Sequence, residues 1–209
     1  MTVAPPTPKG RATRAQLVAA GRRVFANHGY VAATMSQVAD EAGMSMGALY
    51  RYFRNKDDLF ESVIQGVHNE LFDLSRTQQH DLRTEPFLAL LEANTGYLRG
   101  YSEYRDVMRA FMEASHVTER FRNFWWEMRE RHIVRFVDAL VRVRPDLPSA
   151  RVATEAMASM IEQCCYVWFS QAELGDKQVS IEEAALLVTR AWYALCFLDG
   201  STSEHPDTP

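Results

Sequence analysis

The segment 34–53 holds the side chains of this chain that are best suited to contact nucleic acid. Among residues 46–51, Arg51 is the only strong donor to base edges, and a guanidinium suits either a guanine or a phosphate. Gly47 permits close backbone approach, while Met46 and Ala48 offer apolar contact, such as to a thymine methyl group. These residue types predict a surface that can lie against the edges of DNA bases.

Local sequence signals predict that this segment forms two short helices. Thr34 and Gln37 have the spacing of a capping box, which marks the start of a helix. Gly43 can take the left-handed conformation that ends this helix, and Ser45 can cap a second one. Two short helices joined by so tight a turn make a helix-turn-helix, the unit that lays its second helix in the DNA major groove.

The second helix has one face predicted to be buried. Leu49 and Phe53 lie four residues apart and therefore share that face. A turn of about 100° per residue then places Arg51 on the opposite face, together with Gly47 and Ala48. The predicted helix thus directs Arg51 away from the protein core.

The segment 11–72 resembles the DNA-binding domain of the TetR family of transcriptional repressors. The most specific part of the resemblance is the run Leu49-Tyr50-x-Tyr52-Phe53-x-Asn55-Lys56-x-x-Leu59. The resemblance implies that Tyr50 and Tyr52 contact DNA, although core packing is the alternative for Tyr52. It also implies that the rest of the chain binds a small inducer, which alters the spacing of two DNA-binding heads. A three-helix corner that only packs a core is the alternative to the whole reading.

Lys56 begins a further predicted helix, which Asn55 can cap. A lysine in the first turn opposes the helix dipole, so its ammonium and the free N–H groups together predict a phosphate site. Thr34 and Ser36 begin the first helix of the motif and, by analogy with the family, form an equivalent site. The predicted DNA-binding residues are Thr34, Ser36, Ser45, Met46, Gly47, Ala48, Tyr50, Arg51, Tyr52 and Lys56.

The distribution of charge supports the same prediction. The formal net charge is −4, but the segment 9–56 holds eight basic and two acidic residues, a net of +6, which leaves −10 for the remainder. Such an asymmetry suggests a nucleic-acid-binding head on an acidic body.

Composition favours an ordinary globular chain, in one domain or two small ones, with 209 residues of which 47% are hydrophobic. No run approaches the roughly 18 apolar residues of a membrane span, and no signal peptide is recognisable. Cys164, Cys165 and Cys196 lie in helical apolar patterns, which favours buried thiols in a reducing cytoplasm over a redox switch. We therefore expect a cytoplasmic protein.

Helical spacing continues through almost the whole chain without strand-like alternation, so we predict an all-α fold. Its predicted parts are a disordered tail at 1–10, a three-helix DNA-binding domain at 11–55, a helical ligand-binding and dimerisation domain at 56–198, and a disordered tail at 199–209. Outside the motif, helices are predicted at 13–27, 56–79, 85–101, 104–115, 118–143, 150–173 and 181–198.

One predicted helix carries Phe121, Trp125, Met128 and His132 on a single face. Such a stripe is more often ordinary core, but the excess of methionine and aromatic side chains in neighbouring helices suits an internal apolar pocket. The predicted ligand-binding residues are Phe111, Met112, His116, Phe121, Phe124, Trp125, Met128, Met157, Met160, Cys164 and Trp168. Polar groups that could orient a ligand are Asn94, Arg109, Glu113, His116 and Gln163.

The helices predicted at 150–173 and 181–198 are rich in alanine, which permits close approach between helices. Two such helices from each of two chains would form a four-helix bundle, so a homodimer through these helices is predicted. Packing within one chain is the alternative, because periodicity does not distinguish the two kinds of burial.

A metal-dependent enzyme is the competing class of protein. Glu113-Ala-Ser-His116 has the Glu-x-x-His spacing of carboxylate-bridged metal sites in helical bundles, but the sequence has no second such pair and no common catalytic motif. The predicted function is instead a ligand-responsive repressor, without enzymatic activity, cofactor or metal. A small apolar or amphipathic inducer is expected to release it from a near-palindromic operator. A DNA-architectural protein without a ligand is the third alternative.

Overall fold

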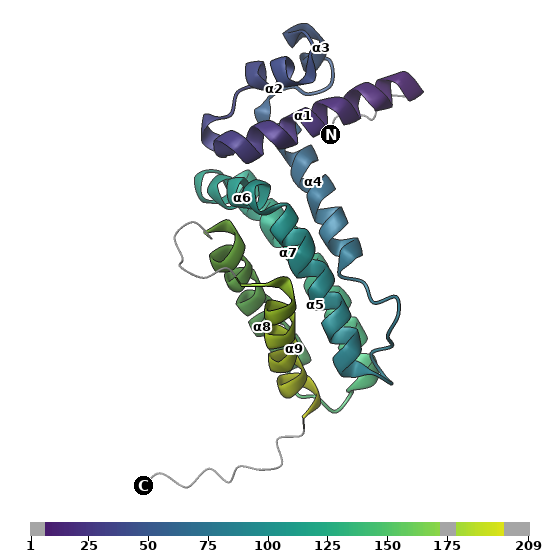
Figure 1. The fold of residues 1–209 in the computed structure, drawn as a ribbon. Helices are drawn as coiled ribbons and strands as arrows, with labels where there is room; N and C mark the ends of the chain where they lie inside the picture. Colours follow the sequence, from purple (N-terminus) through teal and green to yellow (C-terminus); the bar gives the residue numbers. More distant parts are fainter. Residues whose placement is uncertain (1–6, 172–178, 199–209) are drawn as a thin grey trace.

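The computed structural model describes residues 7–171 and 179–198, and within them it consists of helices and short connections, which confirms the predicted all-α class. Figure 1 shows a head, formed by the first three helices, at one end of an elongated body. Among the described residues, no helix combines the length and the apolar character that a membrane crossing requires. The elements are α1 (Pro8–Ala32), α2 (Met35–Ala42), α3 (Met46–Tyr50), α4 (Lys56–Leu74), α5 (Pro86–Glu103), α6 (Arg105–Val117), α7 (Glu119–Val143), α8 (Ala150–Cys165), the π-helical turn η1 (Tyr166–Ser170) and α9 (Ile181–Phe197).

The head is built on the caps that the sequence indicates. The Thr34 hydroxyl accepts a hydrogen bond from the Gln37 amide at 3.3 Å, and the Gln37 side chain accepts one from the Thr34 amide at 2.8 Å, so the capping box is confirmed. Gly43 ends α2 with φ 65°, in the left-handed region that glycine adopts most readily. Ser45 then caps α3 by accepting from the Ala48 amide at 3.2 Å. The predicted helix-turn-helix is present.

Helix α1 begins inside the segment predicted to be a disordered tail. The Thr7 hydroxyl accepts a hydrogen bond from the Gly10 amide at 3.1 Å, and proline is tolerated in a first helical turn, so the helix starts at Pro8. The predicted end of the first helix is marked by Gly29, whose backbone angles are not helical. The rest of that tail, 1–6, and the predicted tail at 199–209 lie outside the described residues.

Helix α4 ends at Leu74, five residues before the predicted boundary at 79. The cause is a contact from a distant part of the chain. The Arg135 guanidinium donates hydrogen bonds to the carbonyl oxygens of Phe72 and Ser75, at 2.6 and 3.3 Å, and so satisfies groups that a longer helix would use.

Two further predicted helices are shorter in the structure. Helix α3 ends at Tyr50, and the next two residues form a turn before Phe53. The helix predicted at 150–173 is α-helical only to Cys165 and then continues as η1.

A cluster of aromatic rings joins the head to the body. The ring centroids of Phe25 and Tyr30 of α1 lie 4.5 and 5.0 Å from that of Phe60 of α4, and the Phe121 ring of α7 lies 5.1 Å from it. Phe25, Phe60 and Phe121 are almost completely buried. Because aromatic contacts of this kind add to the free energy of burial, the head and the body share one core. Phe121, a predicted pocket residue, belongs to this core instead.

In the body, α9 packs along α5 and α8, and α4 packs against α5. The backbones of α4 and α5 touch at Gly96, where a Cβ atom would overlap the carbonyl oxygen of Leu74. Gly66, within α4, instead faces open space.

We expect opposite effects from alanine at these two glycines. Gly96→Ala should lower the free energy of unfolding by about 1–3 kcal/mol, because the two helices must move apart. Gly66→Ala should raise it by about 0.5–1 kcal/mol, since alanine favours the helix and nothing opposes its methyl group. Urea unfolding followed by circular dichroism measures both changes. A Gly96→Ala protein as stable as the wild type would contradict the close contact between α4 and α5.

Candidate DNA-binding face and ligand cavity

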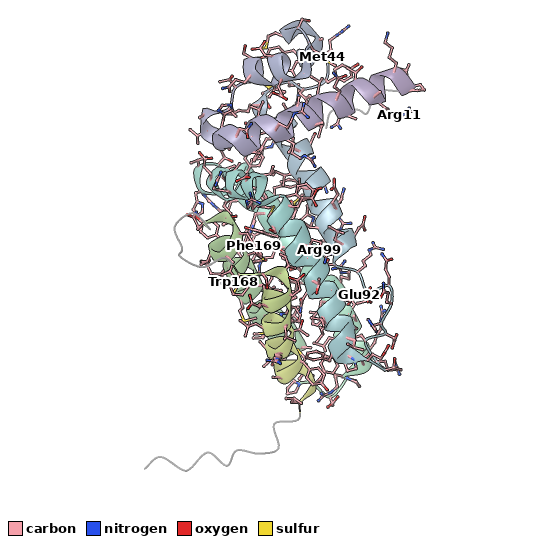
Figure 2. The ribbon with its side chains drawn as sticks, viewed as in Figure 1. Arg11, Met44, Glu92, Arg99, Trp168 and Phe169 are labelled. Carbon is pink, nitrogen blue, oxygen red and sulfur yellow. The ribbon has the colours of Figure 1, made fainter. Side chains whose placement is uncertain are left out.

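The outer side of α3 is open along its length. Met46, Gly47, Tyr50 and Arg51 are exposed, and Ala48 is half-buried. Figure 2 labels Met44 in the turn before this helix, at the end of the molecule farthest from α8 and α9. Arg51 forms no ion pair within the described part of the chain, so its guanidinium is available to another molecule.

The inner side of the same segment is packed. Leu49 and Phe53 have no exposed surface, as predicted, and Tyr52 is half-buried against the same core. Core packing therefore accounts for part of the Tyr52 side chain. Thr34, Ser36 and Ser45 are exposed at the starts of α2 and α3, where the Thr34 and Ser45 hydroxyls cap the two helices. 

Lys56 has protein partners that the sequence does not indicate. Its ammonium donates hydrogen bonds to the carbonyl oxygens of Tyr30 and Val31, at 2.7 and 3.1 Å, and lies 4.6 Å from the centroid of the Tyr30 ring. The predicted cap of this helix is confirmed, since Asn55 accepts from the Asp58 amide at 2.9 Å. Lys56 thus ties the end of α1 to α4, and a phosphate contact would have to share its ammonium with these carbonyl groups.

Glu113 of α6 holds the same two residues from the other side. Its carboxylate accepts hydrogen bonds from the amides of Tyr30 and Val31, at 2.8 and 3.3 Å. The Tyr30 hydroxyl also donates to Asp57 at 2.6 Å, and burial, together with this bond, raises the pKa of Tyr30. We call Tyr30, Val31, Lys56 and Glu113 the head joint, because they connect the head to two helices of the body.

The body contains a cavity of about 1220 Å³ lined by residues of α4, α5, α6, α7, α8 and α9. Of the predicted pocket residues, its wall includes Phe111, Met112, His116, Trp125 and Met128. The others lie outside the wall, and most of them pack against the core: Phe121, Phe124, Met157, Met160, Cys164 and Trp168. Helical spacing indicates which residues are buried, but it does not indicate which buried side of a helix faces an empty volume.

The polar candidates Asn94, Arg109, Glu113, His116 and Gln163 all belong to the cavity wall. Sequence reasoning missed the half-buried ion pair of Arg129 and Glu162, whose atoms Nε and Oε2 lie 3.1 Å apart. It also missed Arg135 and His68. A charged residue on a helix usually marks a solvated face, so no local signal distinguishes these side chains.

His68 and His132 form an edge-to-face pair in the wall, with ring centroids 4.8 Å apart. Burial, with Arg131 nearby, lowers the pKa of His68 to about 4. Burial, with His68 and Arg135 nearby, lowers the pKa of His132 to about 2. Both rings are therefore neutral at neutral pH.

Glu113 and His116, whose spacing in the sequence suggested a metal site, are engaged in other contacts. Glu113 accepts the two amides of the head joint, and His116 Nδ1 lies 2.6 Å from the carbonyl oxygen of Met112. The described residues contain no group of three or more side chains placed to hold a metal ion.

Comparison with known proteins agrees with this geometry. Residues 17–63 match the family described as "Bacterial regulatory proteins, tetR family". The regulator TtgR of Pseudomonas putida is 31% identical over 74 residues, 35% of each chain, and the repressor KstR2 of Mycolicibacterium smegmatis is 36% identical over 96 residues, 45% of this chain and 44% of that one. The matched segments thus span less than half of these relatives. A SmeT–triclosan complex has the same fold, with a TM-score of 0.65 and 20% identity over 94% of this chain and 100% of that one.

The head is thus a helix-turn-helix DNA-binding domain, and the body is a helical domain with a cavity of ligand size. The head matches the DNA-binding motif of the TetR family of transcriptional regulators, and the chain shares the fold of the SmeT–triclosan complex. The relatives that match this segment are named as transcriptional regulators.

The lowered pKa values of His68 and His132 predict a loss of stability in mild acid. As the pH falls below about 6.5, the unfolded chain binds protons that the folded chain does not, so stability present above that pH is lost toward pH 4. Each histidine should remove up to about 1.4 kcal/mol per pH unit. We expect the free energy of unfolding to fall between pH 7 and 5, and to fall less in His132→Asn. Replacing the exposed His28 by asparagine is the control, and an unaltered loss in His132→Asn would contradict the assignment.

Proposed function

We propose that this protein is a cytoplasmic repressor that binds a near-palindromic operator as a homodimer and leaves it when a small apolar or amphipathic molecule fills the cavity. One observation carries the proposal. Glu113 belongs both to the wall of the 1220 Å³ cavity and to the head joint, so one side chain connects a ligand-sized volume to the DNA-binding head. If the ligand and DNA prefer different orientations of the head, linkage requires that the ligand lowers DNA affinity by the same factor as DNA lowers ligand affinity.

DNA binding is assigned to the exposed side of the helix-turn-helix. The free guanidinium of Arg51 is suited to read a base edge, and the net charge of +6 over 9–56 favours the phosphate backbone. The proposed contacts are Thr34, Ser36, Ser45, Met46, Gly47, Ala48, Tyr50, Arg51, Tyr52 and Lys56.

Ligand binding is assigned to the cavity. Its wall combines aromatic and methionine side chains with a small number of polar groups, which is typical of sites for small molecules. The SmeT structure, which has the same fold, is a complex with triclosan, a small molecule. This supports the assignment without identifying the molecule that binds here.

Dimerisation is assigned to α8 and α9. These helices lie side by side and leave large apolar side chains in solvent, including Val152 (64% exposed) and Leu187 (60%), and Leu198, directly after α9, is 58% exposed. An apolar surface of this kind is expected to be covered in solution, and two helices from each chain would complete a four-helix bundle.

Two substitutions should distinguish base reading from backbone contact, once an operator has been selected from a random DNA pool. Arg51→Ala should weaken discrimination at particular base pairs by about 1–3 kcal/mol. Lys56→Ala should weaken binding to all sequences and reduce the slope of log affinity against log salt by about one. Fluorescence anisotropy of labelled operator over a range of salt concentrations measures both.

Arg99→Ala is the matched control, because this exposed arginine lies on the body (Figure 2) and its loss removes the same charge. If Lys56→Ala lowers stability but leaves the salt slope unchanged, Lys56 serves the head joint alone and its phosphate role is wrong. If no pool sequence is enriched by the wild type, the repressor proposal itself fails.

A charge in the exposed face of α9 should produce monomers. Ala194→Arg and Leu187→Arg place a guanidinium where an apolar partner is proposed, and operator affinity should fall with dimerisation because two half-sites must be bound together. Leu88→Arg, at an exposed position on α5, is the control for an added surface charge. Sedimentation velocity gives the oligomeric state, and an unaltered dimer in both α9 variants would place the interface elsewhere.

A further inference from the structure

One corner of the cavity carries more positive than negative charge. It lies where the end of α4 meets α7, around the ring of Phe72. The guanidinium carbons of Arg131, Arg135 and Arg76 lie 3.8, 4.0 and 5.3 Å from the centroid of that ring. In the described part of the chain, only Arg76 among these three arginines forms an ion pair. Its Nε lies 3.3 Å from Oδ1 of Asp73. Two guanidiniums of the corner therefore have no carboxylate partner.

Arg135 is the half-buried member of this group and belongs to the cavity wall. It donates hydrogen bonds to the carbonyl oxygens of Phe72 and Ser75 and to the Ser75 hydroxyl, all of them neutral acceptors. The end of a helix supplies only about half a negative charge, which is less than a guanidinium carries. Burial, with Arg76 and Arg131 nearby, lowers the pKa of Arg135 to about 10. An anion beside Arg135 would relieve this unfavourable charge.

The other arginines that line the cavity already have acid partners. Arg109 pairs with Asp106 at 3.1 Å, and Arg129 pairs with Glu162 at 3.1 Å. Within the described residues, Arg135 is thus the cation of the wall that lacks a carboxylate. A bound anion would therefore be drawn to this corner rather than to another part of the wall.

Two further polar atoms in the corner are without partners. Nδ1 of His68 and Nε2 of His132 are buried and have no hydrogen-bond partner in the structure as described. His68 is only 8% exposed, and the His132 ring lies 5.1 Å from that of Phe72, so both belong to this corner. Unpaired buried polar atoms are unfavourable, so the corner suits the polar end of a ligand rather than its apolar part.

Away from this corner the wall is largely apolar. It includes Leu90, Met108, Phe111 and Trp125. Along the axis of α7, Trp125 and Arg135 are separated by about 15 Å, given a rise of 1.5 Å per residue. The cavity therefore offers an elongated apolar space with its uncompensated charge toward one end.

We propose that the cavity binds an amphipathic monocarboxylate, with the carboxylate on Arg135 and the apolar body directed toward Trp125. A guanidinium and a carboxylate form paired, charge-assisted hydrogen bonds, which fix both position and orientation. The inference rests on the proposed function, since it names the chemical class of the molecule that acts through the cavity.

Three probes with the same hydrocarbon chain separate the effect of the head group: decanoate, decanol and decylammonium. Each is titrated into the full-length protein, below its micellar concentration, while tryptophan fluorescence is recorded, because Trp125 and Trp192 line the cavity. We expect decanoate to bind at least about tenfold more tightly than decanol, and decylammonium to bind most weakly. Arg135→Gln should bring the decanoate-to-decanol ratio of affinities to about one.

Arg109→Gln is the control, because it removes a cavity-lining cation that already has an acid partner, and it should keep the wild-type ratio. Arg135 also caps α4, so Arg131→Gln, at an exposed position in the same corner, is a second variant and should lower the ratio in part. The ratio is the readout because a general disturbance of the cavity weakens both probes together.

The possible outcomes separate this inference from the proposed function. Equal binding of decanoate and decanol by the wild type, or a ratio that neither Arg135→Gln nor Arg131→Gln changes, would overturn the inference and leave the repressor proposal in place. Tighter binding of decylammonium would do the same. If none of the three probes binds, the inference falls and the ligand-responsive part of the proposed function falls with it, while selection of an operator remains its independent test.

Discussion

The placement of the DNA-binding head depends on how the backbone of Tyr30 and Val31 is held. These residues follow the break in α1, where their amide and carbonyl groups lack helical partners. Glu113 accepts from both amides, and Lys56 donates to both carbonyl groups. A charged side chain on each side thus satisfies backbone groups that would otherwise be left unpaired. The cluster of aromatic rings holds the head against the body at the same place by packing.

The head joint and the cavity share two helices. Glu113 of α6 lies in the cavity wall. Helix α4 runs from Lys56 at the head joint to Phe72, around which the arginines of the cavity corner lie. A molecule in the cavity therefore contacts both of the elements that hold the head. The proposed coupling needs no separate pathway, because the same helices form the wall and the joint.

The head could be predicted from the sequence because its signals are local. A capping box at Thr34 and a left-handed turn at Gly43 each involve neighbouring residues, and both are confirmed. The cavity depends on contacts between distant residues. Helical spacing predicts that Phe121 and Trp125 are both buried, yet one packs in the aromatic core and the other lines the cavity. Arg135 gives no local signal at all, since its burial and its capping of α4 arise only when α4 and α7 meet.

The backbone contact between Gly96 and Leu74 gives α4 the mechanics of a lever. At this point α4 rests directly on α5, so the contact opposes inward movement there, and a tilt of α4 would pivot about it. Lys56 lies about 27 Å from this fulcrum, at 1.5 Å per residue, so a tilt of about 5° would carry it roughly 2 Å. A tilt that hardly moves the residues beside the Gly96 contact would therefore move Lys56 by a larger distance. That distance is comparable with the helix shifts that accompany allosteric transitions. The position of Gly96 thus determines how far the Lys56 end of α4 would move for a given tilt.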